Sequence, residues 1–329
     1  MGRRLLITSL ISWLISGVAA ALTVLPVSGA LAAERPVNVY ETTRDALLAI
    51  QRADGSPAAL RELGRRSLDD RRVAAVCHAI AHDLGHAALT AAGGEVATVL
   101  NDRDDVCGGG FTHGAIEQAL GASTRPERDL LRICAPAQDG SCWHGVGHGL
   151  MFATGMDVTR STTLCDRAPR PVLAIRCGEG VFMQRFSGDA AAGHLVTAPV
   201  GYRTPSLATA ARECAAVRSP YGASCWFYAP TLWLAEHPED FAGALRWCEA
   251  QVSAGRSMCT KGLGSRTIKF HPEDPRIGAA VCRSARDVDA CLRGMASYWS
   301  VHWAGKRPGR DVCGRLGDAT LERRCRAVA

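Results

Sequence analysis

The stretch that decides the fold is CWHGVGHGLM, Cys142 to Met151, which combines a cysteine, a glycine three positions later and two histidines four residues apart. Two earlier segments share the cysteine and the histidines: CHAIAHDLGH begins at Cys77, and CGGGFTHGAIE begins at Cys107. Later segments keep the cysteine, and most keep the glycine, but they lack the histidines. We therefore interpret the repeated segment as structural and the histidines as an addition to it.

The spacing of the cysteines predicts a series of helical repeats. Cysteines that open a segment follow one another at intervals of 30, 35, 35, 48, 34, 32 and 34 residues; they are Cys77, Cys107, Cys142, Cys177, Cys225, Cys259, Cys291 and Cys325. Cysteines that close a segment precede the next opening cysteine by 8 to 12 positions; they are Cys134, Cys165, Cys214, Cys248, Cys282 and Cys313. A period of about 34 is typical of stacked helical hairpins. The interval of 48 predicts a loop inserted at residues 186–207.

Composition and small residues point to the same fold class. Glycine stands three positions after five of the opening cysteines, at Gly110, Gly145, Gly180, Gly262 and Gly294. A glycine one turn past the cysteine lets a neighbouring backbone come close, although it costs about 1 kcal/mol of helix propensity relative to alanine. Only 6% of residues are aromatic, against 47% hydrophobic, which suits closely packed helices. We predict an all-α fold, a disulfide-stapled α-solenoid of about seven helical hairpins, preceded by helices at 41–51 and 57–66.

The pattern Cys134-x7-Cys142-x2-Gly145, repeated with this period, resembles the cysteine-rich Sel1-like repeat proteins. The resemblance implies helical hairpins of the tetratricopeptide type with one disulfide in each. It covers residues 107–325 in spacing alone, because the tyrosine and the Gly-x-Gly turn of the Sel1 signature are absent. It therefore implies an architecture and no activity or site.

The N-terminus predicts export. A positively charged start at Arg3 and Arg4 precedes an apolar run over residues 5–25, and Ala30-Leu31-Ala32 offers a cleavage site. Residues 1–32 are expected to be a signal peptide or an uncleaved signal anchor, which makes the protein secreted or extracytoplasmic. Cysteines oxidise in that compartment. We favour a scheme in which each closing cysteine pairs with the opening cysteine 8 to 12 residues later and Cys77 pairs with Cys107; pairing each opening cysteine with a closing cysteine about 23 residues later is the alternative.

The organisation that follows has four parts. Residues 1–32 form the export segment, 33–72 a linker with short helices, 73–160 the histidine-rich repeats, and 161–329 the C-terminal cysteine-rich repeats with the inserted loop. The net charge of +6 comes mainly from scattered arginines without a basic run, which we interpret as solvated surface. No nucleic-acid partner is expected, and contact with a membrane is expected only through an uncleaved anchor.

Histidines are concentrated in the first repeats, since six of the ten lie between residues 78 and 148. Residues four apart share a face of a helix, so His78, His82 and His86 form one stripe and His144 and His148 a second. His113 follows Cys107 by six positions, as His148 follows Cys142. Equivalent helices of neighbouring repeats should therefore point these two side chains in the same direction.

These positions predict a transition-metal centre, because neutral imidazole is the commonest metal ligand. The predicted ion is copper or iron, with zinc less favoured, held singly or as a pair by three histidines of the first helix and three of the next two. Glu117, four residues after His113, is the candidate catalytic proton carrier, a carboxylate ligand, or an acceptor that orients an imidazole. Asp83 and Met151 are weaker candidates. The predicted metal ligands are His78, His82, His86, His113, His144 and His148.

Other interpretations of the histidines stay open at this point: ordinary core packing, a mixed cysteine and histidine zinc site, and a non-covalent haem. Two classes of function also stay open. One is a metal-dependent oxidoreductase or hydrolase; the other is a repeat scaffold that binds a protein or peptide on its surface and keeps metal for stability, storage or delivery. An enzyme needs an open coordination position with a pocket reaching it, whereas a structural ion is closed by four protein ligands.

Overall fold

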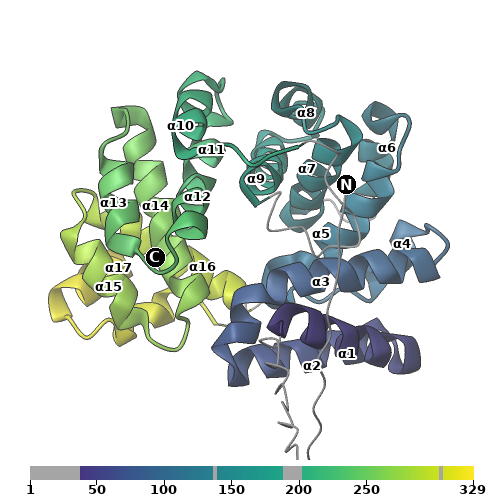
Figure 1. Ribbon diagram of the computed structural model, residues 1–329, viewed down its shortest axis with the longest axis horizontal. Coiled ribbons are helices and arrows are strands. Elements are labelled where there is room, and N and C mark those ends of the chain that lie inside the picture. The colour runs from purple at the N-terminus through teal and green to yellow at the C-terminus, as the bar shows by residue number, and fades with distance from the viewer. Residues whose placement is uncertain (1–37, 136–138, 188–201, 304–306) are drawn as a thin grey trace, which may run out of the picture. The chain divides into compact units, whose positions relative to one another are not determined.

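The computed structural model describes residues 38–135, 139–187, 202–303 and 307–329. Every regular element in these ranges is a helix, which confirms the all-α prediction (Figure 1). The export segment predicted at 1–32 lies outside the described residues, as does most of the predicted loop at 186–207. Among the helices that are described, none is both long and apolar enough to cross a membrane.

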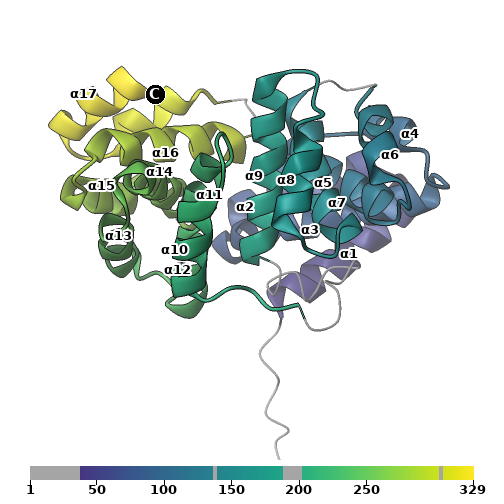
Figure 2. The ribbon, with the colours of Figure 1, turned by 90° about the horizontal axis from the view of Figure 1, so that it is seen from above.

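Seven helices carry the first seven opening cysteines, and we refer to them as the central helices. They pack in chain order, each on the next (Figure 2). They are α3 (Arg71–Ala91), α5 (Val106–Gly121), α7 (Gly140–Ala153), α9 (Pro171–Ser187), α11 (Gly222–Tyr228), α14 (Ser253–Phe270) and α16 (Val288–His302).

The remaining helices connect or flank the central ones. Many begin at a residue whose side chain accepts a hydrogen bond from the first turn, such as Asp157 at α8, Ser206 at α10 and Asp240 at α13. The helices predicted at 41–51 and 57–66 are present and longer, and both pack on α3. The flanking helices are α1 (Val39–Asp54), α2 (Ser56–Asp69), α4 (Val96–Asn101), α6 (Pro126–Ile133), α8 (Val158–Cys165), α10 (Leu207–Ala216), α12 (Pro230–Glu236), α13 (Phe241–Glu249), α15 (Pro275–Ser284), the 3-10 helix η1 (Gly309–Arg315) and α17 (Ala319–Val328).

The row of central helices also makes contacts between its two ends. Helix α14 contacts α3, and α16 contacts α5. In an open solenoid each repeat contacts only its neighbours, so these two contacts are additional to that arrangement. The solenoid and its period of about 34 stay predictions from the sequence. The contacts bring side chains of the first and the last repeats to a common pocket.

Seven disulfides follow the favoured pairing scheme, which is thereby confirmed. Six of them close short loops, usually from the end of a flanking helix to the helix that follows it, and the seventh joins α3 to α5. The pairs are Cys77–Cys107, Cys134–Cys142, Cys165–Cys177, Cys214–Cys225, Cys248–Cys259, Cys282–Cys291 and Cys313–Cys325. This number of disulfides indicates an oxidising environment.

Removing one of these disulfides gives a first prediction. The variant Cys165→Ala/Cys177→Ala should have a free energy of unfolding about 3 kcal/mol lower than the wild type, because the unfolded chain regains the freedom that a disulfide across 12 residues removes. Guanidinium denaturation followed by circular dichroism measures the change. An unchanged denaturation midpoint would contradict the prediction.

Glycines set the distance between the central helices. A Cβ placed on Gly110, Gly180, Gly262 or Gly294 would lie 2.6, 2.0, 1.9 and 1.9 Å from a backbone oxygen of the neighbouring helix, and at Gly145 it would lie 3.1 Å from a backbone Cα. The close approach predicted for these five positions is confirmed. Because α3, α5 and α7 pack at such short distances, their histidine side chains meet.

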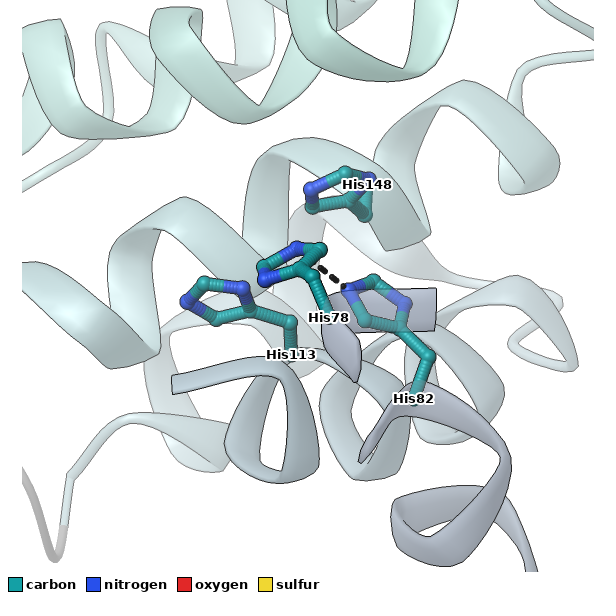
Figure 3. Close-up of side chains that lie close together, drawn as sticks. All are labelled: His78, His82, His113 and His148. Carbon is teal, nitrogen blue, oxygen red and sulfur yellow. Dashed lines mark hydrogen bonds between the residues drawn. The ribbon is translucent and has the colours of Figure 1, made fainter. Parts of the chain in front are cut away.

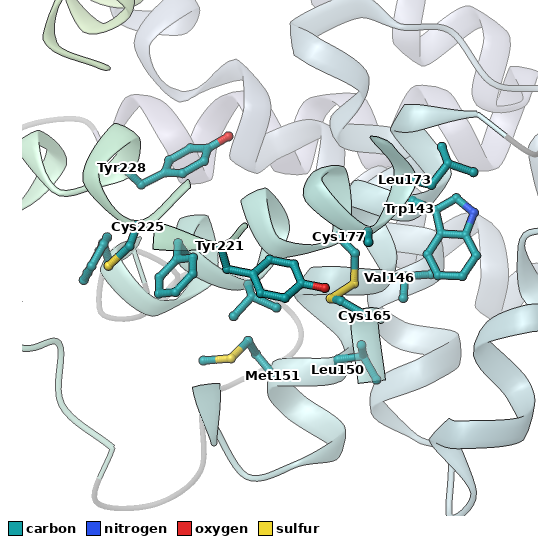
Figure 4. Close-up of a cluster of buried hydrophobic side chains, with 14 of the residues drawn as sticks. Trp143, Val146, Leu150, Met151, Cys165, Leu173, Cys177, Tyr221, Cys225 and Tyr228 are labelled. Atoms are coloured by element: carbon teal, nitrogen blue, oxygen red, sulfur yellow. A yellow bond between two sulfur atoms is a disulfide. The ribbon is translucent and has the colours of Figure 1, made fainter. Parts of the chain in front are cut away.

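Helix α7 buries apolar side chains as well as its histidines. Trp143, Val146 and Leu150 are fully buried, and they belong to one hydrophobic cluster with Leu173 of α9 and the disulfide Cys165–Cys177 (Figure 4). Because other helices cover α7 on all sides, its polar side chains also lie in the interior of the protein. The polar side chains of α7 therefore need partners there.

Candidate metal centre

The six predicted histidines and Glu117 come together from three consecutive central helices. Helix α3 contributes three histidines, α5 contributes His113 and Glu117, and α7 contributes the last two. All are buried except His78, which is half-buried. Figure 3 shows four of the histidines gathered around one space. The stripes that the spacing predicts thus face one another across the helix contacts.

Four of these side chains form one group. His78, His82, His113 and His148 each place a ring nitrogen within 4.8 Å of the nitrogens of the others. The rings of His113 and His148 lie 5.8 Å apart and are nearly parallel, with an angle of 24° between their planes. This agrees with the common direction expected from their equal offsets from Cys107 and Cys142. We refer to these residues as the four-histidine group.

A second group shares His82 with the first and adds His86 and Glu117. The Glu117 Oε2 atom lies 3.0 Å from His82 Nδ1, and Oε1 lies 3.3 Å from His86 Nε2. The sequence predicted one centre held by three histidines of α3 and three of the next two helices. The structure instead divides the ligands between two groups that share His82. His78 and His86 are two turns apart, about 12 Å along the helix axis, so the stripe divides between two groups.

His144 and the weaker candidates lie outside both groups. The His144 ring stacks on His113 at 4.6 Å, and neither of its nitrogens has a hydrogen-bond partner among the described residues. Asp83 accepts a hydrogen bond from the Tyr40 hydroxyl. Met151 belongs to the hydrophobic core. These three side chains thus belong to neither ligand set.

Hydrogen bonds determine which ring nitrogen of two histidines carries the proton. The Nδ1 of His78 lies 2.7 Å from the Cys107 carbonyl oxygen, and the Nδ1 of His82 lies 3.0 Å from the Glu117 carboxylate. Both oxygens are acceptors, so each Nδ1–H donates. A neutral imidazole has one N–H, which leaves a lone pair on each Nε2. These two Nε2 atoms face each other at 3.1 Å (Figure 3).

When both rings are neutral, these two lone pairs repel each other, and either a proton shared between the two Nε2 atoms or a metal cation between them relieves the repulsion. The Nδ1 of His148 is similarly placed, 2.9 Å from Gln184 Oε1. Metal-binding histidines in proteins commonly donate their second ring N–H to a carboxylate or carbonyl, which fixes the tautomer and orients the ring. The chemistry of the four-histidine group therefore suits a metal ion.

Sequence reasoning missed the partners that orient the rings. The Cys107 carbonyl is turned toward His78 by a left-handed backbone, in which Cys107, Gly108 and Gly109 have φ values of 55, 72 and 76°. Glycine adopts such values without steric cost, so the run of three glycines after Cys107 was the available signal. Gln184 lies 36 residues from His148, and nothing in the local sequence connects them.

Electrostatics favour the neutral form of three of the histidines and the ionised form of the Glu117 carboxylate. Burial lowers the pKa of His78, His113 and His144 well below the usual range, and the charges of neighbouring imidazoles lower it further. Burial alone would raise the pKa of Glu117, but its hydrogen bonds to His82 and His86 and their charge outweigh burial and hold the pKa well below the usual range. Deprotonated ring nitrogens and an ionised carboxylate are the forms of these side chains that bind a metal cation.

The lowered histidine pKa values give a second prediction, for the metal-free protein. Below pH 6.5 the unfolded chain binds protons that His78, His113 and His144 do not bind when folded, so stability falls as the pH falls. Each of these three histidines should lower the free energy of unfolding by about 1 kcal/mol between pH 7.5 and pH 5.5. Glu179, whose pKa is raised by burial, acts in the opposite direction. Urea denaturation in EDTA measures the difference, and a stability that is constant or higher at pH 5.5 would contradict it.

Two pockets reach the histidines. The first, of about 240 Å³, is lined by His78, His113 and His144, and the second, of about 590 Å³, by His78, His82 and His148. The walls of the first pocket come from all seven central helices and α12. His86 and Glu117 line neither pocket. Three roles were considered for Glu117: proton carrier, metal ligand and acceptor that orients an imidazole. Its hydrogen bond to His82 favours the third role.

Comparisons of the chain with protein-family models, with curated proteins and with solved structures found no match. The likeness to Sel1-like repeats therefore stays one of cysteine spacing. Any inference about function rests on the geometry of the histidine groups and of the pockets beside them.

Proposed function

We propose that this protein is an extracytoplasmic metalloprotein with a polyhistidine centre, and that the centre is that of a metal-dependent oxidoreductase. The observation that carries the proposal is the pair of Nε2 atoms of His78 and His82, which face each other at 3.1 Å while both Nδ1 atoms lie at hydrogen-bond distance from acceptor oxygens. A divalent cation bound there would remove the repulsion between the lone pairs.

The four-histidine group is the proposed binding site for a single ion. His82 donates its Nδ1 proton to Glu117, so His82 binds metal through Nε2 alone. Glu117 then acts as a positioning residue that holds the His82 tautomer. Ligation by nitrogen suits copper, iron and zinc, and a redox reaction requires copper or iron. A second ion beside His86 would compete with the hydrogen bond between His82 and Glu117.

The two pockets support an enzyme more than a closed structural site. All four members of the four-histidine group line at least one pocket, so a small molecule that enters could reach the bound ion. A catalytic centre needs such an open side. The metal would supply the redox chemistry, while the helices keep bulk water from the buried side of His82 and His148. The disulfides agree with a location outside the cytoplasm.

Elemental analysis by mass spectrometry of the exported protein tests the proposal. The wild type should contain about one equivalent of copper or iron, and the variant His82→Ala/His148→Ala should contain none while retaining its helical circular dichroism. The matched control is His237→Ala/His302→Ala, which removes two histidines outside both groups and should retain the metal. An empty wild type after reconstitution with copper, iron and zinc in turn would overturn the proposal.

A further inference from the structure

The pockets beside the histidines also contain an unusual set of positive charges. The chain has three lysines, and two of them, Lys261 and Lys269, line the first pocket from helix α14. They are eight residues apart with Ser265 midway, so the three side chains share one helix face. Arg266 lines both pockets and is only 6% exposed. Interpreting the net charge as scattered, solvated surface is therefore wrong for these residues.

Within the parts of the chain that the structure describes, no ion pair joins Arg266 or Lys269 to a carboxylate, while the charge of Lys261 acts on the nearby carboxylate of Glu179. Arg266 donates from Nε to the Thr231 hydroxyl at 3.0 Å and from a terminal nitrogen to the Ser265 hydroxyl at 3.2 Å. Both acceptors are neutral. A guanidinium has five N–H donors, so several remain available. The carboxylate of Glu179 in the first pocket is bound to Arg176.

The surroundings of Arg266 hold its guanidinium in place. The group lies 5.6 Å from the centre of the Phe227 ring and 5.1 Å from that of Tyr228. Burial, followed by the charge of Arg266, lowers the pKa of Lys269 to about 8. A buried charge without a partner is costly. A fixed guanidinium beside two ammonium groups is typical of a site that binds an anion.

We propose that the first pocket binds an organic oxyanion, a small molecule with a carboxylate or phosphate group. Arg266 and Lys269 would hold this group beside the histidines that line the same pocket. The guanidinium matches two oxygens of either group, and Lys261 lies on the same wall. The remainder of the ligand would contact Met183, Met258 and the aromatic rings. That this ligand is the substrate of the metal centre rests on the proposed function, whereas binding of the anion requires no metal.

Isothermal titration calorimetry of the EDTA-treated full chain tests the inference with phenyl phosphate, phenylacetate and the neutral benzyl alcohol. At least one of the two anions should bind, and benzyl alcohol should bind at least tenfold more weakly. Lys269→Gln and Arg266→Gln should each raise the dissociation constant of the bound anion by roughly tenfold or more. The matched control is Arg256→Gln, which removes a charge from the same helix outside both pockets and should leave the constant unchanged.

A comparison of the two anions distinguishes a carboxylate ligand from a phosphate ligand. Circular dichroism checks the fold of each variant; if Arg266→Gln does not fold, Lys261→Gln replaces it, because Lys261 is not fully buried. No binding of either anion to the wild type at millimolar concentration, or equal binding to all variants, would overturn the inference. Because the titration is done without metal, a negative result would overturn the anion site alone, whereas an absence of bound metal in the elemental analysis would overturn the metal centre alone.

Discussion

His82→Ala is expected to abolish tight metal binding, whereas His144→Ala should leave the affinity within about tenfold of the wild type. His82 belongs to both candidate groups, and it has one nitrogen beside His78 and the other beside Glu117. Structural zinc sites with four ligands bind with roughly 10–16 kcal/mol. The loss of one ligand of four should therefore cost about 3 kcal/mol, or more than 100-fold in affinity.

Competition with a chromogenic chelator measures both dissociation constants. His144 is the matched control because it is buried, lies on the same helix as His148 and stacks on His113, but belongs to neither group. The variants His78→Ala, His113→Ala and His148→Ala should resemble His82→Ala. If His144→Ala lost as much affinity as His82→Ala, the ligands of the proposed ion would have been assigned wrongly.

Gly114→Ala is expected to lower the free energy of unfolding by about 3 kcal/mol or more and to weaken metal binding at the same time. A Cβ at this position would lie 2.1 Å from the His82 carbonyl oxygen and 2.6 Å from the His82 Cα atom. Backbone atoms cannot rotate away as a side chain does, so α3 and α5 would have to separate. His82 and His113 would then move apart.

Thermal denaturation with and without metal, together with the chelator titration, measures both effects. Gly314→Ala is the control, because the nearest atom to its Cβ would be the end of the Arg326 side chain at 3.9 Å. That variant should stay within about 1 kcal/mol of the wild type. A stable Gly114→Ala protein with unchanged affinity would show that the glycine contact does not position the histidines.

The amino-acid sequence was sufficient for the features that depend on local spacing. Cysteines 8 to 12 residues apart can pair through short loops, so the spacing favoured Cys165 with Cys177 and its counterparts over the alternative of partners about 23 residues apart, and the structure decided between the two. Helical periodicity placed His78, His82 and His86 on one face, and glycines such as Gly110 marked where helices approach. Each of these inferences uses distances along one or two helices, which the geometry of the helix determines.

The division of the histidines and the charge beside them depend on contacts between distant segments. Which oxygen meets each Nδ1 follows from the packing of α3 on α5 and of α7 on α9, so the partners of His78 and His148 had no local signal except the glycines after Cys107. Lys269 lines the same pockets as His78 only because α14 contacts α3, nearly two hundred residues away in the chain. No rule of spacing reaches that far, because contacts at this separation arise from the packing of the whole chain.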